Sequence, residues 1–451
     1  MTAYFADPVS RRDLLKLGLW GITGAWVDPP RLLPEASRSA GTQPNKAIRF
    51  GLNYVPRKNW WYCWQDWDSK SIAEDFRAIA DLGMDHIRIQ CLWPVFQPAE
   101  NYVSSVALGR TTELLDLAGR SYLDVEITVL TGWLSGFPFL PAWVSPLTPD
   151  QNIFKTGGVI AAEKQLFKSL TETIGKHENF LGFDLGNEIN VLHDFGNPAS
   201  VEESDRWAVE ILDYAKQIAP GKFHVNGLDE SPWFSDSGFS RSCAGTAGAA
   251  SIVHCYAYFT GALKRYPYNA VGNLHLLEYM VELAKAYHVD LSRQVWVEEF
   301  GASGEWMPPV YIPDYTTQLV RNALSCGNIW GFTWWCSHDI DPALQGFETL
   351  EYSLGVLDRH NQIKPVGKAL MKLAEETRKS PPRPVERSVA LIVPDGKFPG
   401  AGAEAGWVVA TQFMELVANG VHPAIVLRSR SQEEAYLRAR GIKKLIALKA
   451  V

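Results

Sequence analysis

The chain has 451 residues, which is long enough for a barrel of about 250–350 residues together with a smaller domain. Its formal net charge of -7 argues against binding to a nucleic-acid backbone. The six Cys show no metal-ligand spacing, and we expect Cys91, Cys255 and Cys336, in or beside predicted strands, to be small buried thiols.

The first forty residues are predicted to be an export signal and a linker. The motif Ser10-Arg11-Arg12-Asp13-Leu14-Leu15-Lys16 precedes a short apolar stretch, 17–27, and then Pro29 and Pro30. This stretch is too short to span a membrane. The motif resembles a bacterial twin-arginine signal, which implies export by the twin-arginine machinery to the periplasm or the medium. An ordinary amphipathic helix with a chance Arg-Arg pair is the alternative.

From residue 48 onward, apolar runs typical of strands alternate with helical patterns. Strands are expected at 48–54, 86–91, 123–130, 180–186, 223–226, 251–256, 295–299 and 329–335. Helices are expected at 71–82, 111–120, 161–177, 202–219, 274–288, 315–326 and 365–377, and only the helix after the fifth strand is unclear. This order predicts an α/β fold, a (β/α)8 TIM barrel over 41–380, with the active site at the carboxyl ends of the strands. A doubly wound sheet is the competitor, but no Gly-rich phosphate loop follows the first strand.

A small unit is predicted after the barrel, at 385–451. Pro381-Pro382-Arg383-Pro384 is typical of a stiff linker. Beyond it, strands at 389–393, 423–427 and 444–448 alternate with helices at 405–419 and 432–440. This βαβαβ unit resembles the opening half of a flavodoxin-like domain, and similar domains follow the barrel in some β-galactosidase-like enzymes. It contains no evident catalytic constellation.

Two apolar runs end in carboxylates and carry the predicted chemistry. Glu188 follows the fourth strand and Glu299 ends the seventh, so a closed barrel could bring both into one pocket. Because side chains alternate along a strand, Arg88 is expected to point inward, and His254 and Tyr256 are expected to share a face. Paired carboxylates are what glycoside hydrolysis requires, one as proton donor and one as nucleophile.

These positions, in this order, resemble glycoside hydrolase family 5 and its retaining relatives over about residues 48–378. The resemblance rests on Arg88, Asn187-Glu188, His254-x-Tyr256, Glu299-Phe300-Gly301 and Trp335. It implies a retaining mechanism with Glu188 as acid/base and Glu299 as nucleophile. The resemblance further implies that Asn187 holds the sugar 2-hydroxyl, Arg88 and Tyr256 fix Glu299, His254 tunes the pair and Trp335 floors the subsite.

The expected function is therefore hydrolysis of β-1,4-linked mannan or glucan, as polymer or oligomer, without a metal or organic cofactor. Arg88 should keep Glu299 ionised, and a second nearby negative charge should raise the pKa of Glu188. An exo-acting, β-galactosidase-like β-glycosidase is the runner-up, and a blocked pocket rather than an open cleft would favour it. A non-catalytic sugar-binding barrel and a cofactor enzyme exported with its cofactor are the remaining alternatives.

Several nearby residues leave alternatives open. Glu298 is a rival nucleophile, although alternation places it on the opposite face from Glu299. Glu230, after the fifth strand, is a third candidate carboxylate. His338-Asp339-Ile340-Asp341 has the composition of a metal site, but residues at the rim or in a solvated loop are the preferred interpretation. Where the family often has a His after the third strand, this chain has Leu130-Thr131-Gly132-Trp133.

Tryptophan is abundant, with 17 residues, and many lie in loops after the strands. Flat indole faces match the apolar faces of pyranose rings, which favours a sugar ligand. We expect Trp61, Trp133 and Trp306 to line subsites. Packing of the long loops is the alternative for any one of them.

Overall fold

The computed structural model describes residues 47–144, 148, 150–235 and 238–449. The predicted export signal lies outside these residues. Among the helices of the described residues, none is long and apolar enough to cross a membrane.

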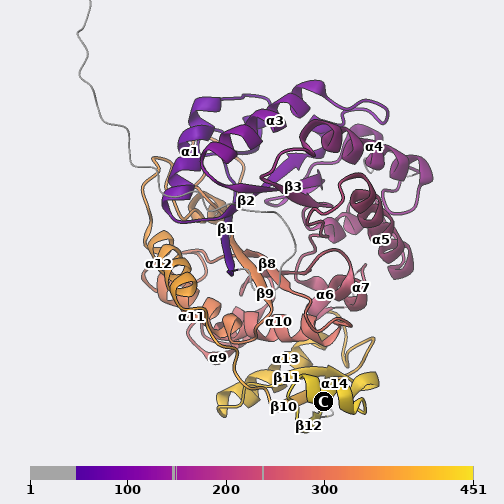
Figure 1. Ribbon diagram of the computed structural model, residues 1–451, viewed down its shortest axis with the longest axis vertical. Coiled ribbons are helices and arrows are strands. Elements are labelled where there is room, and N and C mark those ends of the chain that lie inside the picture. Colours follow the sequence, from indigo (N-terminus) through magenta and orange to yellow (C-terminus); the bar gives the residue numbers. More distant parts are fainter. Residues whose placement is uncertain (1–46, 145–147, 149, 236–237, 450–451) are drawn as a thin grey trace, which may run out of the picture. The chain divides into compact units, whose positions relative to one another are not determined.

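A curled parallel sheet of seven strands forms the centre of the fold, in the spatial order β6-β3-β2-β1-β9-β8-β7 (Figure 1). Side chains on both faces are buried, which explains why these strands appear in the sequence as nearly continuous apolar runs. The strands are β1 (Arg49–Asn53), β2 (His86–Leu92), β3 (Asp124–Thr131), β6 (Phe180–Asp184), β7 (Ser251–Cys255), β8 (Val295–Phe300) and β9 (Ile329–Trp334).

The fifth predicted strand, 223–226, occupies the gap between β6 and β7 but is reduced to a single bridge, Asp184 with Val225. Phe223 N–H donates to the carbonyl of Leu181 at 2.7 Å, so this segment follows β6. On its other side, the N–H of Ala249 donates to the carbonyl of His224 at 2.8 Å. The prediction of a full strand was wrong because pairing here is limited to a few bonds. The segment still closes the ring, and the fold is a (β/α)8 barrel.

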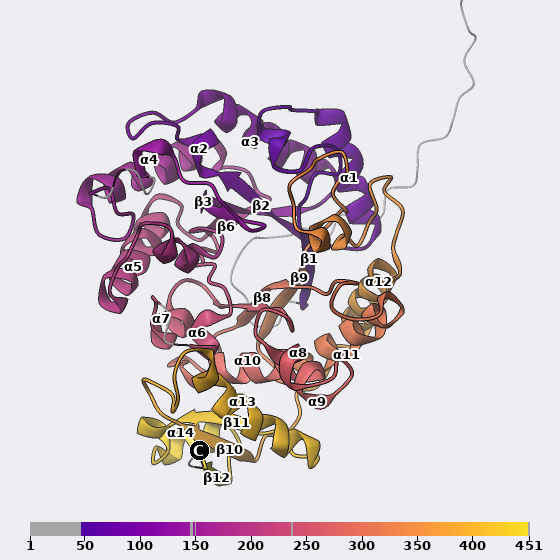
Figure 2. The same ribbon diagram turned by 180° about the vertical axis from the view of Figure 1, so that it is seen from behind.

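Helices surround the strands, as Figures 1 and 2 show. Helix α1 buries Ile72, Phe76 and Ile79 on one face, and Asp68 caps it by accepting the N–H of Ser71. The other long outer helices are α3 (Ser105–Arg120), α4 (Gly157–Ile174), α5 (Val201–Ile218), α10 (Leu276–Ala286), α11 (Ile312–Leu324) and α12 (Pro365–Lys379), with α1 spanning Ser69–Asp81.

Two helix predictions need correction. Helix α3 begins at Ser105, earlier than the predicted residue 111, because the Ser104 side chain caps it by accepting the N–H of Ala107. The helix expected at 274–288 is shorter, at Leu276–Ala286, and His275 separates it from a short helix that precedes it. Short helices fill the connections, namely α2 (Trp93–Phe96), α6 (Ser231–Phe234), α7 (Arg241–Thr246), α8 (Ala262–Arg265) and α9 (Val271–Leu274).

The C-terminal unit forms the predicted small parallel sheet, in the order β11-β10-β12. Its elements are β10 (Val389–Val393), α13 (Ala403–Ala418), β11 (Ala424–Leu427), α14 (Glu434–Ala439) and β12 (Lys444–Ala447). It packs directly on the barrel, where the indole N–H of Trp407 donates to the carbonyl of Thr260 at 2.7 Å. The described residues from 47 onward belong to one compact unit.

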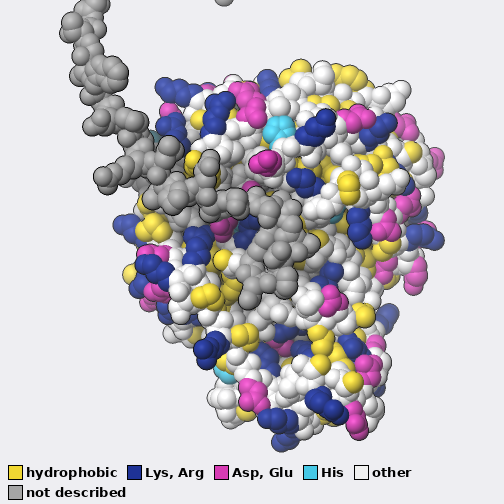
Figure 3. Space-filling model, in the orientation of Figure 1, with side chains coloured by type: hydrophobic (Ala, Val, Ile, Leu, Met, Phe, Trp, Pro, Cys, Tyr) yellow, Lys and Arg dark blue, Asp and Glu magenta, His cyan; other side chains and the backbone are white. Residues whose placement is uncertain are grey.

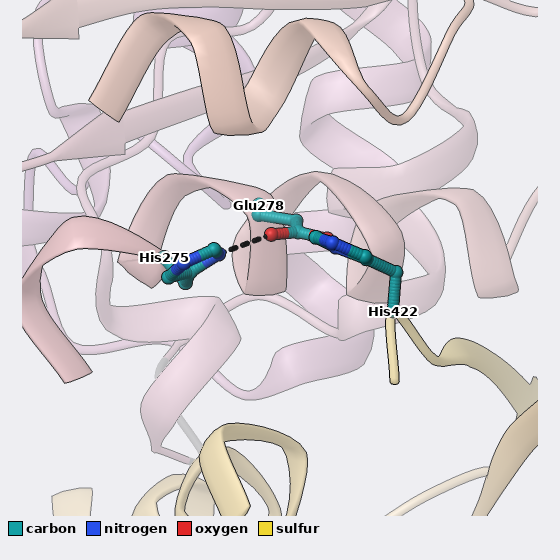
Figure 4. A group of neighbouring side chains, drawn as sticks. All are labelled: His275, Glu278 and His422. Atoms are coloured by element: carbon teal, nitrogen blue, oxygen red, sulfur yellow. Dashed lines mark hydrogen bonds and ion pairs between the residues drawn. The ribbon is translucent and has the colours of Figure 1, made fainter. Parts of the chain in front are cut away.

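A buried ionic cluster joins the C-terminal unit to helix α10. Arg387 lies 2.8 Å from the carboxylate of Glu278 and 3.4 Å from that of Glu282. His275 and His422 approach Glu278 from the two sides, at 2.6 and 2.7 Å, as Figure 4 shows. Because these charges are removed from water, their pairing is obligatory for the folded state.

Charges on the outside are arranged differently. On the face drawn in Figure 3, basic and acidic side chains are interspersed. Exposed pairs such as Lys164 with Glu210, at 2.6 Å, contribute little individually because water screens them. The electrostatic features with large consequences therefore lie inside the barrel and beside α10.

Candidate active site

Glu188 and Glu299 meet at the carboxyl ends of the strands. One carboxylate oxygen from each and a ring nitrogen of His254 all lie within 4.8 Å of one another. Glu188 follows β6 in a left-handed conformation, with φ of 44°, just before the turn η3 (Ile189–Asp194). Left-handed backbone is uncommon for a residue with a side chain, and such strain clusters at functional sites.

Both carboxylate oxygens of Glu299 are held by donors. Arg88 Nη1 donates to Oε1 at 2.7 Å, and Tyr256 Oη donates to Oε2 at 2.9 Å. These bonds fix the orientation of the carboxylate. Burial raises the pKa of Glu299, while His254, Arg88 and Tyr256 oppose the rise. The expectation that Arg88 favours the ionised form is correct in direction, but burial is the larger effect.

His254 connects the two glutamates to a third. Its Nδ1 lies 3.0 Å from Glu188 Oε1 and 3.7 Å from Glu299 Oε2, and its Nε2 lies 3.0 Å from Glu298 Oε2. Burial disfavours a charged ring, but the carboxylates outweigh it and raise the pKa of His254 well above its usual value. A charged imidazole donates from both nitrogens, which matches this geometry.

Glu298 also points into the barrel, contrary to the alternation argument. The pairing of β8 with its neighbours shifts register between Val253 and His254 and again between Val297 and Phe300. This irregularity lets two successive side chains face the same side. Glu298 is fully buried, and its Oε1 lies 3.3 Å from Arg88 Nε. Its carboxylate therefore pairs with Arg88 and His254 inside the barrel and does not face solvent.

Arg88 is the centre of a buried polar network. Its Nη2 donates to Asp184 at 2.6 Å, and its Nη1 donates to Asn53 Oδ1 at 3.0 Å. Burial and Glu298 raise the pKa of Asp184 to about 7, against the effect of Arg88. The sequence analysis missed Asp184 and Asn53, although alternation from Phe180 through Gly182 could have placed Asp184 inside the barrel.

Asn187 is positioned between this network and the loop after β3. Its Oδ1 accepts from Arg88 Nη2 at 3.0 Å, and its Nδ2 donates to the carbonyl of Trp133 at 3.0 Å. The side chain is only 3% exposed. These bonds hold Asn187 next to Glu188 in a fixed orientation.

The tryptophans that were predicted to contact sugar differ in their surroundings. Trp335 is buried, and its ring meets that of Trp60 edge-on, with 5.9 Å between the ring centroids. The ring of Trp306 stacks parallel to that of Tyr258, with 5.3 Å between the ring centroids, and its centroid lies 6.3 Å from that of Tyr256. Trp306 is therefore adjacent to the residue that holds Glu299.

Trp133 and Trp61 pack mainly against other aromatic side chains. Trp133 lies in the hairpin of β4 (Trp133–Leu134) and β5 (Phe137–Pro138), tilted against Phe195 at 5.1 Å. Trp61, in the turn η1 (Trp60–Trp64), is 9% exposed. Its ring packs against those of Phe347, Phe139 and Phe137, with 4.5, 4.7 and 5.4 Å between the ring centroids.

Two further carboxylates have pKa values that are affected by the charges of the pair. Glu230 is partly buried at the start of α6, where burial, Asp229 and Glu188 raise its pKa well above the usual value. Glu351, in the turn η5 (Thr349–Ser353), has a pKa raised to about 7 by burial and by Glu299 and Glu188. The sequence analysis did not identify Glu351, because it lies in a long loop where no periodicity assigns a direction to its side chain.

The segment His338-Asp339-Ile340-Asp341 is part of the loop structure. His338 Nε2 lies 2.7 Å from Asn361 Oδ1, and Asp339 pairs with Lys364 at 2.6 Å. Asp341 pairs with Arg359 at 3.3 Å. These side chains are thus engaged by partners from the segment that follows, at 359–364.

Among the described residues, two groups have the composition of metal ligands: Glu188, His254 and Glu299, and the group of His275, Glu278 and His422. In the first group, Arg88 and Tyr256 each donate a hydrogen bond to one oxygen of Glu299, and His254 is hydrogen-bonded to Glu188. In the second group, Glu278 forms an ion pair with Arg387. The carboxylates of both groups therefore have hydrogen-bonding or ionic partners within the protein.

No protein-family model and no curated protein sequence matches this chain. A GH5_18 protein from Streptomyces cattleya, solved as a glutamate-to-alanine variant in complex with Manβ1-4GlcNAc, is 34% identical. It superposes with a TM-score of 0.84 over 89% of this chain and 99% of that chain. A GH5_18 protein from Bifidobacterium longum subsp. longum, in the same kind of complex, is 31% identical over 89% and 96% of the two chains, with a TM-score of 0.84.

A third structure supports the fold alone. The exo-β-1,4-mannosidase Op5Man5 from Opitutaceae bacterium strain TAV5 is 22% identical, covers 86% of this chain and 72% of its own, and has a TM-score of 0.73. Together with the barrel and the convergence of two glutamates at its mouth, the first two relatives establish the family. The chain belongs to the GH5_18 glycoside hydrolases and is a β-glycosidase with a carbohydrate substrate.

Proposed function

We propose that this protein is a retaining, exo-acting β-mannosidase that removes terminal mannose from short β-1,4-linked oligosaccharides of the Manβ1-4GlcNAc type. The substrate assignment is supported by two GH5_18 relatives whose structures contain this disaccharide and which align with this chain over 99% and 96% of their own length. This assignment narrows the expected substrate from mannan or glucan to a mannoside. It also favours an exo-acting enzyme over an endo-acting one.

The observation that carries the mechanism is the separation of Glu188 and Glu299. Retaining enzymes place their carboxyl groups about 5 Å apart, whereas inverting enzymes leave room for a water, at roughly 6.5–9.5 Å. Here oxygens of the two groups lie within 4.8 Å. This spacing supports direct attack on the sugar rather than attack by a bridging water.

In the proposed double displacement, Glu299 attacks the anomeric carbon while Glu188 protonates the leaving oxygen, which breaks the glycosidic bond. A covalent glycosyl ester on Glu299 results. Glu188, now a carboxylate, takes a proton from water, and this water attacks the same carbon and releases Glu299. Arg88 and Tyr256 each bond one oxygen of Glu299 and so hold it for attack.

Exo action is supported by an aromatic wall, which we define as Trp61, Phe137, Phe139 and Phe347. These residues come from the segments after β1, β3 and β9 and contact one another at 4.5 to 6.1 Å. Trp61 also stacks on Trp60, which contacts Trp335. We infer that this wall limits the Trp335 side of the site, which favours a short terminal substrate over a polymer that must pass through an open cleft.

The substrate assignment is tested by incubating the protein with Manβ1-4GlcNAc, β-1,4-mannobiose, mannan, cellobiose and aryl β-glycosides. We expect release of mannose from Manβ1-4GlcNAc, with the β-anomer appearing first by NMR, and negligible loss of viscosity of mannan. Rapid depolymerisation of mannan would instead support an endo-acting enzyme. First appearance of the α-anomer would contradict retention.

The roles of the two glutamates are separated by chemical rescue. Glu299→Ala and Glu188→Ala should each lower kcat by about 10³-fold or more. Azide should rescue Glu299→Ala with an α-mannosyl azide, because it attacks in place of the nucleophile, and should rescue Glu188→Ala with a β-mannosyl azide. Glu305→Ala, at an exposed glutamate, is the control and should retain activity. Unchanged turnover in either active-site variant would move its role to another carboxylate.

A further inference from the structure

Glu351 is a carboxylate in a segment that is tied to two other segments near the barrel mouth. Its Oε2 accepts from Ser135 Oγ at 3.0 Å. Three residues later, the carbonyl of Leu354 accepts from the indole N–H of Trp334 at 2.9 Å. Ser135 lies in the turn between β4 and β5, whereas Trp334 ends β9. Glu351 therefore has a defined position although it lies in a long connecting segment.

The environment of this carboxylate is unusual for a structural role. Its described hydrogen bond comes from a hydroxyl rather than from a cation. The hairpin that carries this hydroxyl also holds Asn187 next to Glu188, because Asn187 Nδ2 donates to the carbonyl of Trp133 at 3.0 Å. Burial and the negative charges of Glu299 and Glu188 raise the pKa of Glu351. Placing a partly buried carboxylate near two others costs stability, and such arrangements are typical of functional sites.

The aromatic wall fixes the segment that carries Glu351. Phe347, four residues earlier, contacts Trp61 at 4.5 Å and Tyr352 at 5.8 Å. Tyr352 Oη in turn donates to the carbonyl of Leu344 at 2.7 Å. Glu351 thus lies in a segment that the aromatic wall anchors.

A carboxylate accepts several hydrogen bonds, and the one described donor, Ser135, does not exhaust the capacity of Glu351. In sugar sites, aromatic faces supply contact area and a few placed polar groups decide which hydroxyls are accepted. A carboxylate is also the group that rewards a correctly placed hydroxyl most strongly, because the hydrogen bond is charge-assisted.

Building on the proposed function, we propose that Glu351 is a specificity-determining residue that accepts hydrogen bonds from hydroxyls of the terminal sugar, on the edge of the ring that faces the aromatic wall. The ligand class is a neutral pyranose that is unsubstituted on this edge. Glu351 is distinct from the catalytic pair, since it binds the sugar and does not exchange protons with the scissile bond.

The test compares aryl β-mannoside with its 3-, 4- and 6-deoxy analogues in wild type, Glu351→Ala and Glu351→Gln. In wild type, at least one deoxy analogue should lose about 100-fold in kcat/KM. In Glu351→Ala the parent substrate should fall to a similar level, and the same deoxygenation should then cost less than about 3-fold, since its partner is gone. The other deoxy positions should keep their wild-type ratios.

Glu348→Gln is the matched control, because this exposed glutamate lies in the same segment three residues earlier and should leave all ratios unchanged. Thermal unfolding of each variant separates loss of a contact from loss of fold. A uniform loss with parent and all analogues in Glu351→Ala, or no loss, would overturn the proposal.

Failure of the mannosidase assignment gives a different result. The series is run on whichever aryl β-glycoside the wild type cleaves best, so a glucoside or galactoside preference would refute the mannoside while leaving the Glu351 test intact. If no glycoside is turned over, titration calorimetry of mannose, glucose and galactose and their deoxy forms replaces kinetics, with loss of the same selectivity in Glu351→Ala as the expected result.

Discussion

At the scale of single residues, the site shows how one carboxylate is kept reactive inside a barrel. Burial raises the pKa of Glu299, and the three groups that oppose the rise are His254, Arg88 and Tyr256. If Glu299 is the nucleophile, it must be ionised, so its raised pKa should set the acidic limb of the pH profile, and activity should fall as the pH drops through it.

Removing one of these groups should move the acidic limb of the pH profile. In Tyr256→Phe, the carboxylate loses a hydrogen bond of 2.9 Å to its ionised form, so the pKa of Glu299 should rise further. We expect the acidic limb of kcat/KM to shift upward by about one pH unit. Tyr315→Phe, at a buried tyrosine away from the site, is the control and should leave the profile unchanged. A shift to lower pH would contradict the role of Tyr256.

At the scale of elements, the closure of the barrel depends on a close approach between β6 and the segment 223–226. A Cβ atom on Gly182 would lie 2.0 Å from the carbonyl oxygen of Phe223. No side chain fits there without moving the backbone. The segment 223–226 can thus lie next to β6 because Gly182 has no side chain.

This explanation predicts opposite effects of two Gly→Ala substitutions. Gly182→Ala should lower the free energy of unfolding by about 3 kcal/mol, because it forces strand and segment apart. Gly109→Ala, within α3 and with nothing within 4 Å of its new Cβ, should raise it by about 0.5–1 kcal/mol. Urea unfolding of both variants checks the prediction, and equal stabilities would refute it.

At the scale of the whole molecule, the C-terminal unit is attached through buried charges on α10. Burial opposes ionisation of Glu282, but Lys285, Arg387 and Arg440 outweigh it and lower its pKa to about 2. A carboxylate with a depressed folded pKa contributes stability that is present above its ordinary pKa of 4.5 and is lost as the pH falls toward 2.

Arg387→Met should therefore be strongly destabilising. It leaves Glu278 and Glu282 buried with fewer cations, which should cost about 3–5 kcal/mol at pH 7. The loss of stability between pH 4.5 and 2 should also be smaller than in wild type, since the depression of the pKa of Glu282 is partly removed. Arg383→Met, at an exposed linker arginine, is the control for urea unfolding across this range. A variant as stable as wild type would show that the cluster does not anchor the unit.

Much of this architecture follows from the sequence. Continuous apolar runs such as 86–91 and 329–335 identify buried parallel strands, and strand-end residues such as Glu188 and Glu299 meet because parallel strands share one carboxyl edge. The inward direction of Arg88 follows from alternation, and its partner Glu299 was expected from the resemblance, whereas its bond to Asn187 was not predicted. Local pattern determines these features because each depends on periodicity within one element.

Only the tertiary structure decided the rest. The register shift in β8 turns Glu298 inward beside Glu299, which a strict two-residue period excludes. The position of Glu351 depends on a loop that the contact of Phe347 with Trp61 fixes, and the expected fifth strand is reduced to a single bridge. These features arise from contacts between segments far apart in the chain, and local pattern holds no information about where such segments meet.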